Sequence, residues 1–254
     1  MSSKGTLKDR LHRAEPLIGS FLKTPAAQAA EIMGATRLDL VCIDAEHGPF
    51  DRGAIDLCLL ALRSRQMPAI VRVPSSSHEH ILSALVGGAT GVMVPHVWNT
   101  AIAEEVVRAA HFGPGGRGYA GGPRSSDYGA MDVKTYLDEA LKTTVVIVQI
   151  EDVAALDHVD AIAQVSGVDA LFVGRMDLTV GLGASSPDAP DVLAAVARIC
   201  AAGKANGRCV GMFVSDVAEA AHWRAMGASL FILSSDHRFI QTGANQLADR
   251  FHNP

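Results

Sequence analysis

The chain has 254 residues, a formal net charge of -5 and 48% hydrophobic residues. This length fits one α/β barrel with a single large core, so we expect one domain over residues 1–254. Lys and Arg form no block that would suit nucleic acid or an anionic membrane, so small molecules are the expected partners. The sequence shows neither a signal-peptide core nor a run of about 18 apolar residues, which predicts a cytoplasmic protein.

Eight short runs rich in Val, Ile and Leu, each bounded by turn or capping residues, predict strands. They cover residues 17–22, 38–44, 69–73, 91–95, 145–151, 170–174, 209–214 and 230–234. Ala-rich stretches with helical periodicity lie between most of them, for example AAQAAEIMGA and DVLAAVARICAAGKANG. The repeated βα order predicts a (β/α)8 TIM barrel of the α/β class. The lack of GxGxxG after the first strand argues against a Rossmann domain.

The connection over residues 112–141 is longer than a usual loop and rich in glycine and charge. Its length predicts a functional loop rather than a linker. The segment GPGGRGYAGGPR within it could offer backbone amides, Arg117 or Arg124 to an anionic group, although glycine-rich loops are common.

The cysteines show neither CxxC spacing nor a nearby histidine cluster, which disfavours a zinc site and a disulfide framework. We expect unreactive thiols in a reducing compartment. The four residues are Cys42, Cys58, Cys200 and Cys209.

Polar residues that end apolar runs form the candidate site, because the chemistry of such barrels lies at the carboxyl ends of the strands. They are Asp44, Glu46, His47, Arg72, His96, Glu151, Arg175, Asp177 and Asp236. Glu151 and Asp177 follow consecutive strand runs, so their carboxylates are expected side by side, where they would suit Mg2+ or Mn2+. Capping of the following helices explains the same two residues equally well, and spacing alone leaves both readings open.

Three other residues also bear on the chemistry. Arg72 lies inside the apolar run AIVRVP, where an unpaired guanidinium is costly, so an anion from protein or substrate is expected beside it. His47 ends the segment DAEH, which suits a general acid or base, with an exposed loop histidine as the alternative. Only Lys23 among the lysines comes near a strand end, which disfavours Schiff-base chemistry. Other histidines are expected to be solvated, such as His78, His80, His158 and His222.

Several segments that together span nearly the whole chain resemble the HpcH/HpaI metal-dependent pyruvate aldolases, which are class II aldolases. They are IGSFL, LDLVCIDAEHGPF, VRVP, GATGVMVPHVWNTAIAEE, GPGGRG with PRSSDYG, VQIED, GVDALFVGRMDLTVGLG and the SSD that ends the last strand. The resemblance implies a metal-dependent carbon–carbon lyase. Through a metal-stabilised enolate, it would reversibly cleave a 4-hydroxy-2-oxo acid to pyruvate, or a related 2-oxo acid, and an aldehyde.

The resemblance also implies roles for individual residues. Glu151 and Asp177 would bind a divalent metal, Mg2+, Mn2+ or Co2+, that pyruvate chelates through its carboxylate and 2-oxo group. Arg72 would stabilise the enolate oxygen, and His47, supported by Asp44, would transfer the proton. Further substrate-binding residues would be Gln149, Gly174, Arg175, Met176 and His96.

Three departures from the family pattern bear on specificity. Arg175 and Met176 replace the middle of the usual Gly-Pro-Ala/Ser-Asp-Leu segment beside the pyruvate carboxylate, and Arg175 suggests an acidic or polyhydroxy aldehyde. Val86 stands where relatives carry an Asp that is contributed across a subunit boundary. His96 replaces a usual Met and would either transfer protons or line the pocket.

The resemblance leaves two alternative functions open, an acyl-CoA lyase of the same superfamily and a non-catalytic 2-oxo acid binding protein. It further implies a homo-oligomer, a trimer or hexamer, in which subunits exchange a helix.

Overall fold

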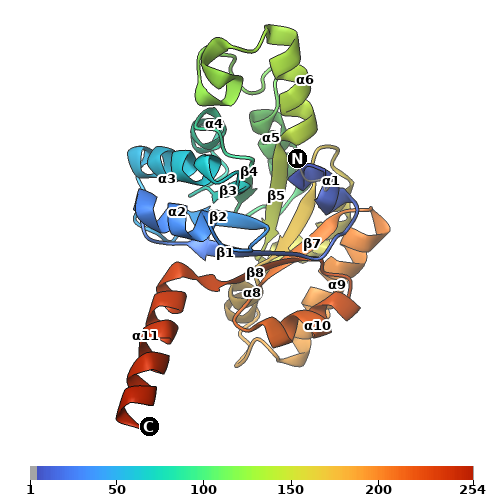
Figure 1. The fold of residues 1–254 in the computed structure, drawn as a ribbon. Coiled ribbons are helices and arrows are strands. Elements are labelled where there is room, and N and C mark those ends of the chain that lie inside the picture. Colours follow the sequence, from blue (N-terminus) through green and yellow to red (C-terminus); the bar gives the residue numbers. More distant parts are fainter. Residues whose placement is uncertain (1–4, 254) are drawn as a thin grey trace.

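A closed barrel of eight parallel strands forms the centre of the molecule (Figure 1). The structure is a computed structural model that describes residues 5–253. The strands pair in sequence order and β8 closes onto β1, which confirms the predicted (β/α)8 barrel. They are β1 (Leu17–Leu22), β2 (Leu40–Asp44), β3 (Ala69–Arg72), β4 (Gly91–Val94), β5 (Val145–Ile150), β6 (Ala170–Val173), β7 (Cys209–Val214) and β8 (Leu230–Ser235).

Helices follow the strands and cover the outside of the barrel (Figure 1). Several begin at a side-chain cap; Asn99, for example, accepts a hydrogen bond from the Ile102 amide. The helices are α1 (Leu7–His12), α2 (Ala27–Gly34), α3 (Arg52–Ser64), α4 (His78–Val86), α5 (Thr100–Ala110), α6 (Val133–Thr143), α7 (Val159–Gln164), α8 (Arg175–Gly181), α9 (Pro190–Ala205), α10 (Val217–Ala225) and α11 (Asp236–His252), with 3-10 turns η1 (Arg124–Gly129) and η2 (Val153–Asp157).

Two apolar cores fix where a site can lie. One packs the strands against the helices, and the other fills the barrel itself with residues such as Ile70, Met93 and Ile147. Leu7 and Leu11 of α1 belong to this inner core. The barrel is therefore packed rather than hollow, and the carboxyl ends of the strands are the natural place for a binding site.

All four cysteines are free and buried, as predicted. Burial raises the pKa of Cys42 to about 12 and the pKa of Cys209 to about 11. Because a thiol must ionise to act as a nucleophile, these residues are unsuited to covalent catalysis near neutral pH.

The connection over residues 112–141 folds into η1 and α6 and packs on the barrel's helices instead of covering its open end (Figure 1). Arg124 makes a bidentate pair with Asp56, with distances of 2.8 and 2.9 Å. Arg117 is buried, lies 4.7 Å from the centre of the Phe112 ring and donates to the Tyr136 hydroxyl. Arg124 is thus engaged by a protein carboxylate, whereas Arg117 contacts only neutral groups and its Nε has no hydrogen-bond partner among the described residues. Anion binding by this segment stays a prediction.

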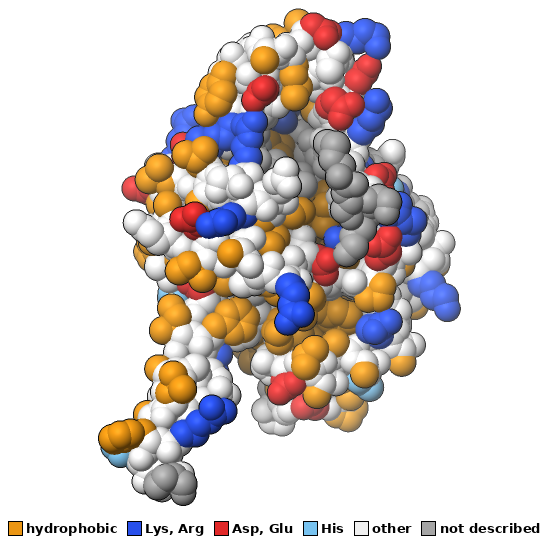
Figure 2. All heavy atoms as spheres, in the orientation of Figure 1, with side chains coloured by type: hydrophobic (Ala, Val, Ile, Leu, Met, Phe, Trp, Pro, Cys, Tyr) orange, Lys and Arg blue, Asp and Glu red, His pale blue; other side chains and the backbone are white. Residues whose placement is uncertain are grey.

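Helix α11 projects away from the barrel (Figure 1). Apolar side chains lie along it (Figure 2), and those of Ile240, Leu247 and Phe251 are 68%, 67% and 81% exposed. Within the described residues, no helix combines the length and apolarity needed to cross a bilayer.

Candidate functional site

A buried ion pair joins the ends of β2 and β3. Asp44 lies opposite Arg72 in the strand register, and Arg72 donates from Nε to Oδ1 (2.9 Å) and from Nη2 to Oδ2 (2.8 Å). Lys23 Nζ lies 3.2 Å from the same Asp44 Oδ2, and the Arg72 guanidinium stacks 4.5 Å from the centre of the Phe21 ring. The anion predicted beside Arg72 is thus a protein carboxylate.

The electrostatics of this pair follow from its burial. Asp44 is fully buried and Arg72 is 8% exposed. Burial tends to raise the pKa of Asp44, but the hydrogen bonds and charge of Arg72, the hydrogen bond from the His47 amide and the charge of Lys23 together outweigh burial and hold the pKa below its usual range. Both groups stay charged, and the two-pronged contact fixes the plane of the guanidinium.

His47 lies on the turn after β2 with 60% of its side chain exposed. Its Nδ1 is 3.5 Å from Glu46 Oε2. The support predicted from Asp44 reaches His47 through the main chain, because Asp44 Oδ1 accepts the His47 amide at 3.1 Å. Asp44 therefore positions the turn that carries His47 rather than the imidazole itself.

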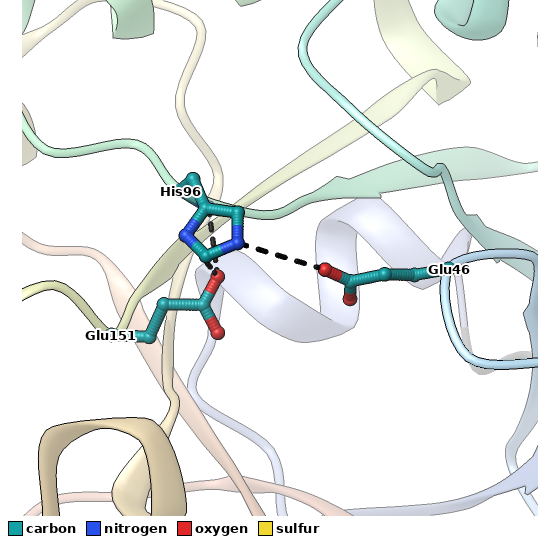
Figure 3. A group of neighbouring side chains, drawn as sticks. All are labelled: Glu46, His96 and Glu151. Atoms are coloured by element: carbon teal, nitrogen blue, oxygen red, sulfur yellow. Dashed lines mark hydrogen bonds and ion pairs between the residues drawn. The ribbon is translucent and has the colours of Figure 1, made fainter. Parts of the chain in front are cut away.

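Three potential metal-binding side chains converge after β2, β4 and β5, namely Glu46, His96 and Glu151 (Figure 3). Each offers one ligand atom, and these atoms lie within 4.8 Å of one another. The His96 amide donates to Glu151 Oε1 at 2.8 Å, while its Nε2 lies 4.0 Å from Glu46 Oε1. His96 has a φ of 55°, a left-handed conformation that is uncommon outside glycine and is often kept at functional sites.

Negative charge gathers in this cluster. Burial raises the pKa of Glu46 above its usual value, and Glu151 adds to this rise while Arg72 opposes it. Burial tends to lower the pKa of His96, but Glu151 and Asp152 outweigh burial and raise it. Such a set of groups can hold a cation.

Glu151 is fixed by the close approach of β5 and β6, whose last paired residues are Ile150 and Val173. A Cβ at Gly174 would lie 2.4 Å from the Glu151 Cβ, so a side chain at this position would push the two strand ends apart. Gln149 Nε2 donates to Glu151 Oε2, and Glu151 is 4% exposed.

Asp177 lies in the first turn of α8, at the same end of the barrel as Glu151. It is exposed, and among the described residues its carboxylate is not part of the cluster of Glu46, His96 and Glu151. Arg175, two residues earlier, turns towards α10: its Nη2 donates to Glu219 Oε2 at 3.1 Å, and its guanidinium lies 4.9 Å from the Trp223 ring centre. The Arg175 charge is thus engaged within the protein.

A cavity of about 900 Å³ opens at this end of the barrel. The predicted residues that line it are Arg72, Gln149, Gly174, Arg175, Met176 and Asp177. Asp44, His47, His96 and Glu151 lie outside this lining. Val86 borders two separate hollows beside α3 and α4 and does not reach the cavity.

The sequence alone gave no specific role to Glu46 and treated Lys23 only as a potential Schiff-base lysine. Glu46 joins the metal-type cluster and lies 3.3 Å from Arg72 Nη1. Lys23 pairs with Asp44 and lines the cavity. Their positions directly after strand runs were the available signal.

Comparison with known proteins identifies the family. A family model described as HpcH/HpaI aldolase/citrate lyase matches residues 17–241. A hydroxypyruvate/pyruvate aldolase from Paraburkholderia phytofirmans is 36% identical and covers 94% of this chain and 95% of its own. A 4-hydroxy-2-oxovalerate aldolase from Rhodococcus jostii is 35% identical over 97% of this chain and 95% of its own.

The fold agrees with this assignment. An HpcH/HpaI aldolase/citrate lyase family protein from Burkholderia cenocepacia J2315 has a TM-score of 0.91 and 36% identity, covering 97% of this chain and 99% of its own. Similarity over nearly the full length, together with the aldolase relatives, makes the protein a carbon–carbon lyase of the aldolase type. The chain belongs to the HpcH/HpaI aldolase/citrate lyase family.

Proposed function

We propose that the enzyme reversibly cleaves a 4-hydroxy-2-oxo acid to pyruvate, or a related 2-oxo acid, and an aldehyde. The observation that carries this proposal is the position of Arg72. Its guanidinium is fixed by two hydrogen bonds to Asp44, and Arg72 lines the same cavity as Gln149 and Asp177. A fixed, largely buried cation stabilises an oxygen whose negative charge develops as the carbon–carbon bond breaks.

We assign Glu151 and Asp177 to a divalent cation, Mg2+, Mn2+ or Co2+. Carboxylate oxygens suit these ions. The crowding of Glu46, His96 and Glu151 fits a cation, and buried Gln149 Oε1 has no hydrogen-bond partner among the described groups. When bound, the ion supplies Lewis-acid polarisation of the 2-oxo group.

We assign the other steps of the reaction to side chains of the protein. Arg72 binds the oxygen of the 2-oxo group, and Asp44 keeps the guanidinium in place. His47 takes the proton of the 4-hydroxyl group during cleavage and returns it during synthesis. Gln149, Gly174, Arg175 and Met176 line the cavity and border the 2-oxo acid there. His96, which lies outside this lining beside Glu151, is assigned to the same substrate site from the Glu151 side.

The metal-loaded enzyme is expected to exchange the methyl protons of pyruvate for deuterium in D2O, because the proposed reaction passes through the enolate of pyruvate. Chelation is expected to stop the exchange, and added Mn2+ to restore it. Proton NMR measures this without knowledge of the aldehyde.

Each alternative has its own outcome in these assays. Full exchange after chelation contradicts the metal assignment. Pyruvate binding without exchange indicates a non-catalytic 2-oxo acid binding protein. Cleavage of CoA thioesters but not of free hydroxy-oxo acids indicates an acyl-CoA lyase.

We further propose that α11 packs against a second copy of the chain in a trimer or hexamer. Exposed apolar side chains on a projecting helix suit burial in a subunit interface. The double substitution Leu247→Asp and Phe251→Asp is expected to lower the mass measured by light scattering to that of a smaller assembly or monomer. The double substitution Asn245→Asp and Gln246→Asp, which makes the same charge change at two exposed polar positions of the helix, is the control. A monomeric native protein contradicts the proposal.

A further inference from the structure

The Glu151 carboxylate directs its two oxygens towards different parts of the barrel end. Oε1 accepts the His96 amide at 2.8 Å and lies 3.4 Å from His96 Nδ1, just after β4. Oε2 would lie 2.9 Å from a Cβ at Gly174, the residue between β6 and α8. Because α8 carries Asp177, the Oε2 side belongs to the proposed ligand pair of Glu151 and Asp177. The cluster of Glu46, His96 and Glu151 uses the Oε1 side.

The His96 ring is oriented like that of many histidines that bind a metal. Such residues usually donate one ring N–H to a carboxylate or carbonyl, which leaves the other nitrogen for the ion. His96 Nδ1 lies 3.2 Å from Asp152 Oδ2, while Nε2 faces Glu46 Oε1 at 4.0 Å (Figure 3). Bonds from Zn2+ to imidazole nitrogen or carboxylate oxygen are about 2.0–2.2 Å long, so one ion fits between these two atoms.

Glu46 is held in place by contacts to its other oxygen. Oε2 lies 3.3 Å from Arg72 Nη1 and 3.5 Å from His47 Nδ1, and it is buried without a hydrogen-bond partner among the described residues. The Arg72 charge is already balanced by Asp44, which accepts two hydrogen bonds from it. Glu46 Oε1 is therefore left facing His96, and the carboxylate keeps negative charge that a cation can neutralise.

One imidazole and two carboxylates define the kind of cation that the cluster suits. Imidazole nitrogen favours Zn2+ and other late first-row ions such as Co2+, whereas Mg2+ takes oxygen ligands. The His96 side chain is 62% exposed, so solvent reaches the cluster and water can complete the coordination. Several classes of enzyme hold two metal ions about 3.5–4 Å apart, and an ion beside each oxygen of Glu151 would produce such a pair.

We propose that Glu46, His96 and Glu151 form a second cation site, which takes Zn2+ or Co2+ and shares Glu151 with the first. The sharing rests on the proposed assignment of Glu151 and Asp177 to a divalent cation, whereas the cluster itself does not depend on that assignment. Loss of Glu46 or His96 is therefore expected to affect one ion, loss of Asp177 the other, and loss of Glu151 both.

The test is the number of Co2+ ions bound per chain, measured by equilibrium dialysis and elemental analysis after a chelator has removed all metal. The native protein is expected to bind two. Glu46→Gln and His96→Asn are each expected to weaken the binding of one ion by at least about tenfold. Asn tolerates the left-handed φ of 55° at this position, so the amide that contacts Glu151 keeps its place. His158→Asn, at an exposed histidine outside the cluster, is the matched control that should keep both ions.

The visible absorption of bound Co2+ shows whether an imidazole binds the ion, because exchanging a nitrogen ligand for oxygen changes the spectrum. His96→Asn is expected to change this spectrum. A native protein that binds a single Co2+ overturns the second site. Two ions that both persist in Glu46→Gln and His96→Asn also overturn it.

The same measurements separate this site from the proposed aldolase function. If the native protein binds one ion and still exchanges the methyl protons of pyruvate, the second site fails and the aldolase proposal stands. If His96→Asn loses one ion while Asp177→Asn keeps both, the second site stands and the assignment of Asp177 fails.

Discussion

Replacing Glu151 by Gln is expected to lower kcat/KM for pyruvate formation by at least about a thousandfold, because a charge that holds the metal is lost. The fold is expected to survive, since Gln keeps an oxygen that can accept the His96 amide as Glu151 Oε1 does at 2.8 Å. Asp177→Asn is expected to have a similar effect on turnover. Steady-state cleavage assays and circular dichroism measure the two properties.

Metal affinity shows whether these losses arise at the metal. Both variants are expected to bind Mn2+ at least about tenfold more weakly in calorimetric titrations. Asp157→Asn is a matched control, because it removes a carboxylate that is 84% exposed and lies outside the cavity lining. Turnover that persists in either variant would contradict the assignment of that residue as a metal ligand. Lost turnover with native Mn2+ affinity would show that the residue acts in catalysis without binding the metal.

The barrel was predictable because its strands are buried on both faces and therefore read as continuous apolar runs. Strand ends were less predictable. Leu38 extended the apolar pattern of β2, but the strand begins at Leu40, and the Leu38 amide instead contacts the Thr36 hydroxyl at 3.4 Å. Glu151 and Gly174 likewise extended two patterns, although β5 and β6 end one residue earlier. Local hydrogen bonds decide these ends, and hydropathy does not encode them.

The candidate site was predictable in its location but not in its pairing. The sequence predicted an anion beside Arg72, from either the protein or the substrate. The strand register places Asp44 opposite Arg72, so the anion is a protein carboxylate. The partners of Arg175 were not foreseeable, because Glu219 and Trp223 lie more than forty positions further along the chain, on α10. Contacts between helices so far apart in sequence depend on how the barrel closes.

The Arg72–Asp44 pair is expected to show strong coupling in a double-mutant cycle. Arg72→Met is expected to destabilise the fold by about 3 kcal/mol, because it leaves the fully buried Asp44 carboxylate with only Lys23 as a cationic partner. Asp44→Asn removes that buried charge. The double variant is therefore expected to be more stable than the sum of the single effects predicts, by about 2 kcal/mol. Urea unfolding of the four proteins measures the coupling.

Measurements of activity and of the pH dependence of stability separate the catalytic role of Arg72 from the stabilising effect of the Arg72–Asp44 ion pair. All variants that lack Arg72 are expected to lose deuterium exchange by at least about a hundredfold, and the double variant should regain stability without regaining exchange. The pKa of Asp44 is lowered in the folded protein, so its stabilisation is present above the unfolded value of about 4 and is lost as the pH falls through the folded pKa. The stability gap between the native protein and Arg72→Met should therefore narrow below about pH 4. Additive single effects, or a gap that stays constant down to low pH, would show that the pair contributes nothing beyond its separate side chains.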